Sequence, residues 1–252
     1  NFTDVISLII SYIASIFSSK DASAKRTFGY KRAEILAAFV NAATLVVIAV
    51  ILIKEAIERF LNPQTIESDL VIILSFVAIL GNGFSVLLLK SQSQRNMNMK
   101  SAYLHLLTDM LASVAVLIGG LLMKFYEIFW IDSLLTLAIA LYLIYVSVDL
   151  LFKSYRVLML FTPEHVNIEK IVNKVNTIDG VSLLHHVHVW QLNDDEIHLE
   201  AHLDFKENFR ISEFDDILIK IENLLKTDFS INHVTIQPEY NKPDSKDIIV
   251  QD

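Results

Sequence analysis

The sequence predicts a membrane domain made of helices, followed by a small soluble α+β domain. Of the 252 residues, 53% are hydrophobic, and in the first part of the chain they gather into long blocks. Such blocks are typical of helices that cross a lipid bilayer. After about residue 160, amphipathic helical and strand patterns replace them. We therefore expect a transmembrane domain over 1–160, a soluble domain over 161–240 and a disordered tail over 241–252.

Five apolar segments predict membrane-spanning helices, at about 1–19, 34–61, 69–90, 101–124 and 130–152. In the first segment, the apolar run Val5–Phe17 would give roughly 20 Å of helix, whereas a bilayer core needs about 30 Å. We therefore expect that this helix begins upstream of Asn1. Lys and Arg gather in the first and third connections and after the last segment, which indicates that these parts are cytoplasmic.

The soluble domain is predicted to have the element order αββαβ. The elements are a helix over Glu164–Thr177, strands over His185–Leu192 and Ile197–Phe205, a helix over Glu213–Lys226 and a strand over His233–Glu239. This order favours helices that cover one face of a sheet.

The fourth apolar segment carries two ionisable residues, His105 and Asp109. Their spacing of four residues places both side chains on one face of a helix. Ionisable groups are costly in hydrocarbon and usually face a partner, a cavity or an ion pathway. An imidazole nitrogen and a carboxylate oxygen form half of a tetrahedral zinc shell. A buried hydrogen bond between helices is the simpler alternative, but the pair favours metal or proton binding.

Asp4 is a second intramembrane candidate. It could cap the first helix, but a helix that begins there would be too short to span the bilayer. If the helix continues upstream, Asp4 and the pair His105–Asp109 can meet between two packed helices. Three metal ligands are then in place, and tetrahedral zinc requires a fourth ligand or a water molecule.

The composition excludes several classes of function. The chain has no cysteine, so imidazole and oxygen must supply any metal ligands. The net charge of -8 argues against nucleic acid as a partner. No nucleophile–base pair and no HExxH motif is present, so we do not expect an enzyme.

These motifs resemble those of the cation diffusion facilitator family, especially its zinc-transporting members. His105-Leu-Leu-Thr-Asp109 matches the family's second His-x-x-x-Asp motif, and Asn1-Phe-Thr-Asp4 matches the end of the first. Thr27-Phe-Gly-Tyr-Lys-Arg-Ala-Glu34 resembles the connection into the family's third helix. The soluble domain adds His185-His-Val-His-Val-Trp190, Ala201-His202 and Thr235-Ile-Gln237.

The resemblance implies that the visible helices are the second to sixth of six, and that a histidine precedes Asn1. It implies export of zinc from the cytoplasm in exchange for protons by alternating access, with Asp4, His105 and Asp109 as transport ligands. Manganese, iron, cobalt or cadmium could be carried instead. The main alternative is a non-transporting, metal-sensing or scaffolding membrane subunit.

The resemblance also implies a cytoplasmic domain that forms a homodimer and binds regulatory zinc. His185, His202 and Glu239 match the family's ligand positions there, with His233 and Gln237 as secondary candidates. A solvated polar sheet face is the alternative interpretation of these residues. The short connection Gln92–Lys100 lacks histidine, which favours a bacterial inner-membrane protein with a cytoplasmic C-terminus.

Overall fold

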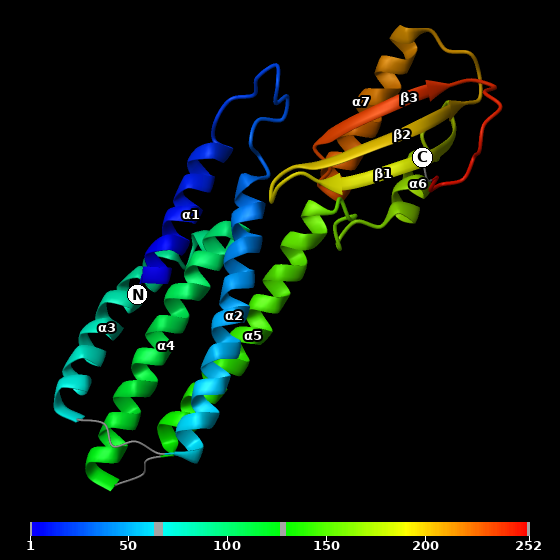
Figure 1. Cartoon of the computed structure of the whole chain (residues 1–252). Helices are drawn as coiled ribbons and strands as arrows, with labels where there is room; N and C mark the ends of the chain where they lie inside the picture. Colours follow the sequence, from blue (N-terminus) through cyan, green and yellow to red (C-terminus); the bar gives the residue numbers. More distant parts are fainter. Residues whose placement is uncertain (1, 63–67, 127–129, 251–252) are drawn as a thin grey trace. The chain divides into compact units, whose positions relative to one another are not determined.

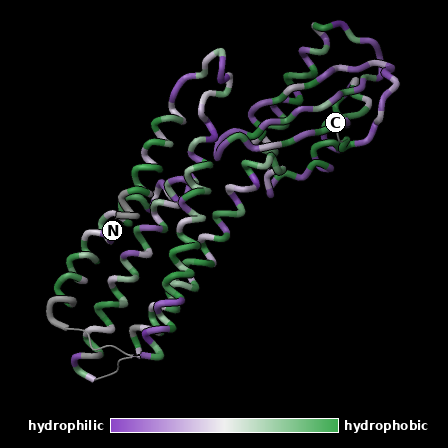
Figure 2. The backbone as a smooth tube through the Cα atoms, in the orientation of Figure 1, coloured by the Kyte–Doolittle hydropathy of each residue, from purple (hydrophilic) through white to green (hydrophobic). Residues whose placement is uncertain are grey.

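Two compact units make up the chain (Figure 1). The computed structural model describes residues 2–62, 68–126 and 130–250. The first unit extends to Tyr155 and the second begins at Arg156. Figure 2 shows hydrophobic residues along the helices of the first unit, with more hydrophilic residues in the second. This arrangement confirms the predicted fold class, a helical membrane domain followed by an α+β domain.

The first unit consists of helices. They are α1 (Phe2–Ser18), α2 (Ala33–Leu61), α3 (Ser68–Leu89), the short 3-10 helix η1 (Gln92–Gln94), α4 (Met97–Tyr126) and α5 (Ile131–Leu158). Within the described residues, four of these helices are long and apolar enough to cross a membrane, and α1 has a shorter apolar stretch, Ile6–Ser18. All five predicted apolar segments are therefore helical.

Helix α4 is central to the packing of the first unit, because α1, α2 and α3 all contact it. Helix α5 joins α2 and α4 through a buried apolar cluster. The cluster contains Ala42, Leu45 and Ala49 of α2, Leu104 of α4, and Leu143 and Leu150 of α5. At its cytoplasmic end, Lys100 of α4 also lies 3.8 Å from the carboxylate of Asp149 on α5.

The second unit has the predicted order αββαβ. Its elements are α6 (Ile168–Val175), β1 (Val181–Gln191), β2 (Ile197–Phe205), α7 (Ile211–Phe229) and β3 (His233–Glu239). The prediction that the first of these helices begins at Glu164 is wrong, because the side chain of Asn167 accepts a hydrogen bond from the amide of Lys170 and caps the helix at Ile168. Strand β1 is longer than predicted and begins at Val181.

The three strands form one sheet in the order β1-β2-β3, with β1 and β2 antiparallel and β2 and β3 parallel. Helix α7 makes the crossover between the two parallel strands. The apolar sides of α6 and α7 pack on one face of this sheet. Buried residues of this core include Ile171 and Val175 of α6, Val187 of β1, Leu199, Ala201 and Leu203 of β2, and Ile221 and Leu225 of α7.

A bulge in β1 determines which residues reach the other face of the sheet. Leu184 and Val187 both belong to the core, although they are three residues apart rather than two. The pairing with β2 shifts between His185 and His188, and His186 has a positive φ of 49°. As a result, two successive residues, His185 and His186, lie between neighbouring core positions.

The segment after β3 follows the bulged strand. The sequence predicts a disordered tail here, and over 241–250 the structure has no helix or strand. The segment is nevertheless attached to β1: the amides of His186 and Val187 donate to the carbonyl oxygens of Asp247 and Ile248, at 3.1 and 2.8 Å. Ile248 also packs partly buried against the core.

Candidate metal centre

The first candidate centre lies on α4. His105 is buried, with 4% of its surface exposed, and Asp109 one turn later is half-buried. The hydroxyl groups of Thr108 and Ser113 donate to the carbonyl oxygens of Leu104 and Asp109, both at 2.8 Å. These hydroxyls are thus satisfied within the helix, and the imidazole and the carboxylate are the candidate ligand groups of this stretch.

Hydrogen bonds fix the level of α1 against α4. The side-chain amide of Asn98 on α4 donates to the carbonyl oxygen of Ser11 on α1, at 2.8 Å. Asp4 lies seven residues before Ser11 on α1, and His105 lies seven residues after Asn98 on α4. Both are therefore about 10 Å along the helix from this contact. The backbone at residue 4 is therefore level with His105. The side chain of Asp4 lies outside the described part of the chain.

Asn41 of α2 joins α1 and α4 about one helical turn away from the level of residue 4 and His105, on the side of Asn98. Its carbonyl oxygen accepts a hydrogen bond from Ser7 at 3.1 Å, and its amide donates to Ser11 at 2.9 Å and to Ser101 at 3.4 Å. All four side chains are at least 96% buried. Ser7 is three residues after Asp4 and Ser101 is four before His105, so this polar junction supports both ligand positions from one side.

Asn98 ends the junction towards the cytoplasm. Its amide nitrogen is bonded to Ser11, but its fully buried Oδ1 has no hydrogen-bond partner among the described residues. A buried acceptor of this kind costs free energy until a donor or water reaches it.

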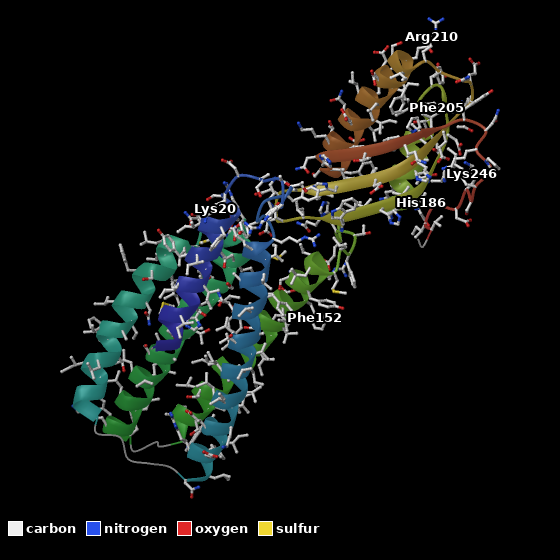
Figure 3. The ribbon with its side chains drawn as sticks, turned by 45° about the horizontal axis from the view of Figure 1, so that its top comes forward. Lys20, Phe152, His186, Phe205, Arg210 and Lys246 are labelled. Carbon is white, nitrogen blue, oxygen red and sulfur yellow. The ribbon has the colours of Figure 1, made fainter. Side chains whose placement is uncertain are left out.

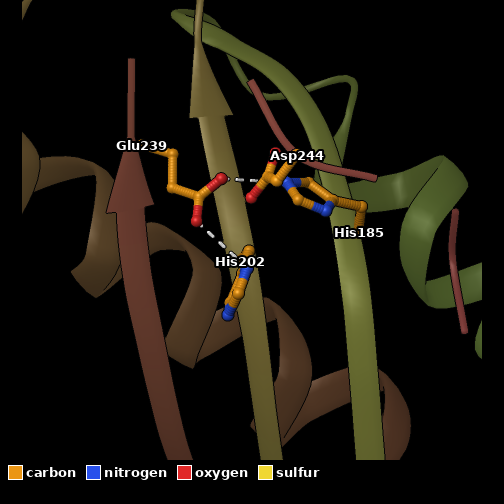
Figure 4. Close-up of side chains that lie close together, drawn as sticks. All are labelled: His185, His202, Glu239 and Asp244. Carbon is orange, nitrogen blue, oxygen red and sulfur yellow. Dashed lines mark ion pairs between the residues drawn. The ribbon is translucent and has the colours of Figure 1, made fainter. Parts of the chain in front are cut away.

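The second candidate centre lies on the polar face of the sheet (Figure 4). The register places His185 of β1 opposite His202 of β2, and Asp204 of β2 opposite Glu239 of β3. Nε2 of His185 is 3.3 Å from Glu239 and 3.2 Å from Asp204, and Nδ1 of His202 is 3.0 Å from Glu239. With Asp244 of the tail, the ligand atoms of His185, His202 and Glu239 all lie within 4.8 Å of one another.

Two lysines of the tail neutralise this acidic cluster. Lys242 and Lys246 both bind Glu239 and Asp244. Burial alone would raise the pKa of Glu239, but hydrogen bonds from Lys242, Gln237 and Lys246 together hold it below its ordinary value. The lysine hydrogen bonds likewise hold the pKa of Asp244 below its ordinary range, led by the bond from Lys246.

His202 is held in the neutral form that binds metals. Desolvation is the largest cause that lowers its pKa, and the positive charge of Lys242 and the two neighbouring histidines add to the effect, against the opposing charge of Glu239. Because a metal ligand must be deprotonated, a lowered pKa makes His202 available near neutral pH.

The predicted residues divide between ligand and support positions. His185, His202 and Glu239 meet, and Gln237 donates to Glu239 at 2.7 Å beside them. His233 is not brought to this cluster. It pairs in register with His198, and the two ring centroids are 4.5 Å apart.

Sequence reasoning missed several residues of both centres. The alternation of apolar and polar residues along β2 puts Asp204 on the same face as His202, which is a usable signal in the sequence. Asp244 and the lysines lie in a tail whose composition suggests disorder, so only the tertiary contacts reveal them. In the membrane domain, Asn41 is the one polar residue among the buried residues of α2.

If the junction holds α1 against α4, loss of the Asn41 side chain will leave buried serine hydroxyls without their partner. We expect Asn41→Ala to destabilise the membrane domain by about 1–3 kcal/mol, measured by thermal unfolding in detergent. Thr44→Ala on the same helix is the control, since Thr44 is half-buried and its hydroxyl donates to the carbonyl oxygen of Val40 within its own helix. Equal stability of the two variants would contradict this role.

Comparison with known proteins agrees with the fold of both units. Residues 1–159 match the family model for the cation efflux transmembrane domain, and residues 163–241 match that for the cytoplasmic domain of cation efflux proteins. The chain is 34% identical over 239 residues to the cadmium, cobalt and zinc/H(+)-K(+) antiporter of Bacillus subtilis, which covers 94% of this chain and 76% of the relative.

Two further relatives have the same extent of similarity. The metal cation efflux system protein CzcD of Cupriavidus metallidurans is 32% identical over 94% of this chain and 74% of its own length. The zinc transporter ZitB of Yersinia pestis is 31% identical over 94% of this chain and 76% of its own length. The chain therefore belongs to the cation efflux family, as an integral membrane transporter, not an enzyme, with a cytoplasmic C-terminal domain.

Proposed function

We propose that this transporter exports zinc from the cytoplasm in exchange for protons. The observation that carries the proposal is the pair of buried His105 and half-buried Asp109 on α4, with His105 at the level of residue 4 of α1. Three ionisable positions within about one helical turn of each other in an apolar bundle are costly unless a cation compensates the carboxylates. One relative named as a cadmium, cobalt and zinc antiporter and another named as a zinc transporter support the same assignment.

The exchange for protons follows from the chemistry of the ligands. Zinc binds neutral imidazole and ionised carboxylates, so its arrival releases protons and its departure allows them to return. The ordinary pKa of histidine, about 6.5, is close to cytoplasmic pH, so His105 can take part in this exchange. If the site opens alternately to the two sides of the membrane, outward movement of metal is coupled to inward movement of protons.

The ligand types also indicate the range of metals. Imidazole suits zinc and similar transition-metal ions, whereas magnesium and manganese prefer shells of oxygen ligands. We therefore infer that cadmium and cobalt can compete with zinc for the site formed by Asp4, His105 and Asp109, in agreement with the name of the Bacillus subtilis relative.

Zinc-driven proton flux in proteoliposomes tests the transport site. We expect His105→Ala and Asp109→Ala each to lower the flux by more than about tenfold, because each removes one metal ligand. Thr108→Val is the matched control, since its hydroxyl bonds Leu104 of the same helix and lies between the two ligands. Proton flux that survives the loss of both ligand side chains would refute the site. If the unaltered chain shows no zinc-driven proton flux, the result would favour a non-transporting subunit.

We also propose that His185, His202, Glu239 and Asp244 bind a regulatory divalent cation. Two imidazoles and two carboxylates supply four donors, the number that a tetrahedral zinc site requires. Glu239 is 1% exposed at its side chain and accepts bonds from both sides of the cluster, so it is the central oxygen ligand.

Glu239→Gln keeps the shape of the side chain and removes its charge. We expect it to weaken zinc binding by the cytoplasmic domain at least tenfold, or about 1.4 kcal/mol, measured by calorimetry on the full chain. The control is Glu200→Gln, an exposed residue on the same strand. If the two variants bind zinc equally well, the cluster is not the ligand set.

We further propose that the transporter is a homodimer that pairs through its cytoplasmic domain. The match of residues 163–241 to the family's cytoplasmic domain supports this arrangement. The mass of the protein in detergent, measured by light scattering, is expected to equal two chains. A monomeric mass at micromolar concentration would contradict it.

A further inference from the structure

Lys246 lies where a metal bound to the cytoplasmic cluster would lie. Its Nζ is 3.3 Å from Nε2 of His185, 3.3 Å from Oε2 of Glu239 and 2.8 Å from Oδ2 of Asp204, and it also binds Asp244. Three of these four residues belong to the ligand set. Figure 3 shows Lys246 and His186 in the same part of the cytoplasmic domain, where the tail bonds β1.

Lys242 binds the other side of the same carboxylates. Its Nζ contacts Oε1 of Glu239 and lies 3.3 Å from Oδ2 of Asp244. Each oxygen of Glu239 therefore accepts from a different lysine. Together the two ammonium groups carry two positive charges, the charge of one divalent cation, and they face the three carboxylates Asp204, Glu239 and Asp244.

We propose that Lys246 and Lys242 are built-in competitors of the regulatory metal, so that a divalent cation binds only when it displaces their ammonium groups from the cluster. The inference rests on the proposed metal site of the cytoplasmic domain and adds its regulation. Through these two lysines, the tail after β3 stabilises the metal-free form of this site.

The two kinds of cation exclude each other for geometric and electrostatic reasons. A zinc ion lies about 2.0–2.2 Å from its nitrogen and oxygen ligands and uses the same lone pairs that now accept from the lysines. An ammonium group and a divalent cation within about 4 Å of each other also repel strongly where the cluster is shielded from water. Glu239 and His185 are almost fully buried, so this shielding applies to them.

The position of the lysines is fixed by the tail. Asp247 and Ile248 accept hydrogen bonds from the β1 amides next to His185, and Ile248 packs against the core. The backbone of Lys246 is therefore held beside the bulge of β1, next to His185. Its side chain is 35% exposed and that of Lys242 is 45% exposed, so both can swing into solvent while Asp244 stays near the cluster as a ligand.

The competition has two effects on the site. In the metal-free state, the ammonium groups stabilise carboxylates that would otherwise repel one another, so the ligands stay together. The same contacts also weaken metal binding. The apparent affinity equals the affinity of the free cluster multiplied by the fraction of molecules in which the lysines have left it. The cytoplasmic domain would then be half-saturated at a higher zinc concentration than its ligand set alone would require.

Zinc titration of the full chain by calorimetry tests this competition. Lys246→Met keeps the length of the side chain and removes its charge, and we expect it to bind zinc on the order of tenfold more tightly. It should also lower the thermal stability of the metal-free protein, because the carboxylates lose a neutralising charge. A purely structural role would lower the stability without strengthening the binding. Lys220→Met, an exposed lysine of α7, is the charge-matched control.

The full chain has two proposed zinc sites, so the calorimetric heat must be assigned to one of them. The zinc binding that is lost in Glu239→Gln is the binding to the cytoplasmic cluster. If that part is present in the unaltered chain and has the same affinity in Lys246→Met, the competition is refuted while the metal site stands. If no zinc binding depends on Glu239 in either protein, the metal site itself is refuted. Tighter binding in Lys246→Met, with the control unchanged, supports the proposal.

Discussion

Compensation of buried charge is the constraint on which both halves of this protein depend. A carboxylate that leaves water must be offset by a cation or by several hydrogen bonds. Asp109 lies half-buried in an apolar helix, and Glu239 lies almost fully buried at the end of a strand. In the membrane domain the compensating cation is the proposed cargo. In the cytoplasmic domain two lysines of the same chain compensate the carboxylates.

The scaffold around each centre serves to hold the ligands at a common level. In the membrane domain, Asn41 bonds serines of α1 and α4 and so helps to keep residue 4 and His105 at the same level. In the cytoplasmic domain, the strand register does the same for His185, His202 and Glu239. The first arrangement is made by side chains between helices that can shift, and the second by backbone pairing that cannot shift without loss of the sheet.

Much of this organisation could be predicted from the sequence, because hydrophobic periodicity reports both domains and the alternation of β2 reports its polar face. His105 and Asp109 stood out for the same reason, as charges in an apolar run. The sequence could not reveal Asp244 or Lys246, since a polar tail without periodicity has no predicted place. It also did not fix where His233 lies relative to the cluster, because a shared strand face does not determine the position along the strand, and His233 pairs with His198.

The contact between Asn98 and Ser11 has a consequence for movement of the membrane domain. A conformation that separates α1 from α4 at this level would break the hydrogen bond and expose the amide of Asn98, which is fully buried here, to water. Opening would thus replace one hydrogen bond within the protein by hydrogen bonds to solvent, and such an exchange changes the free energy by only about 0.5–1.5 kcal/mol. The contact therefore joins the two helices without locking them together.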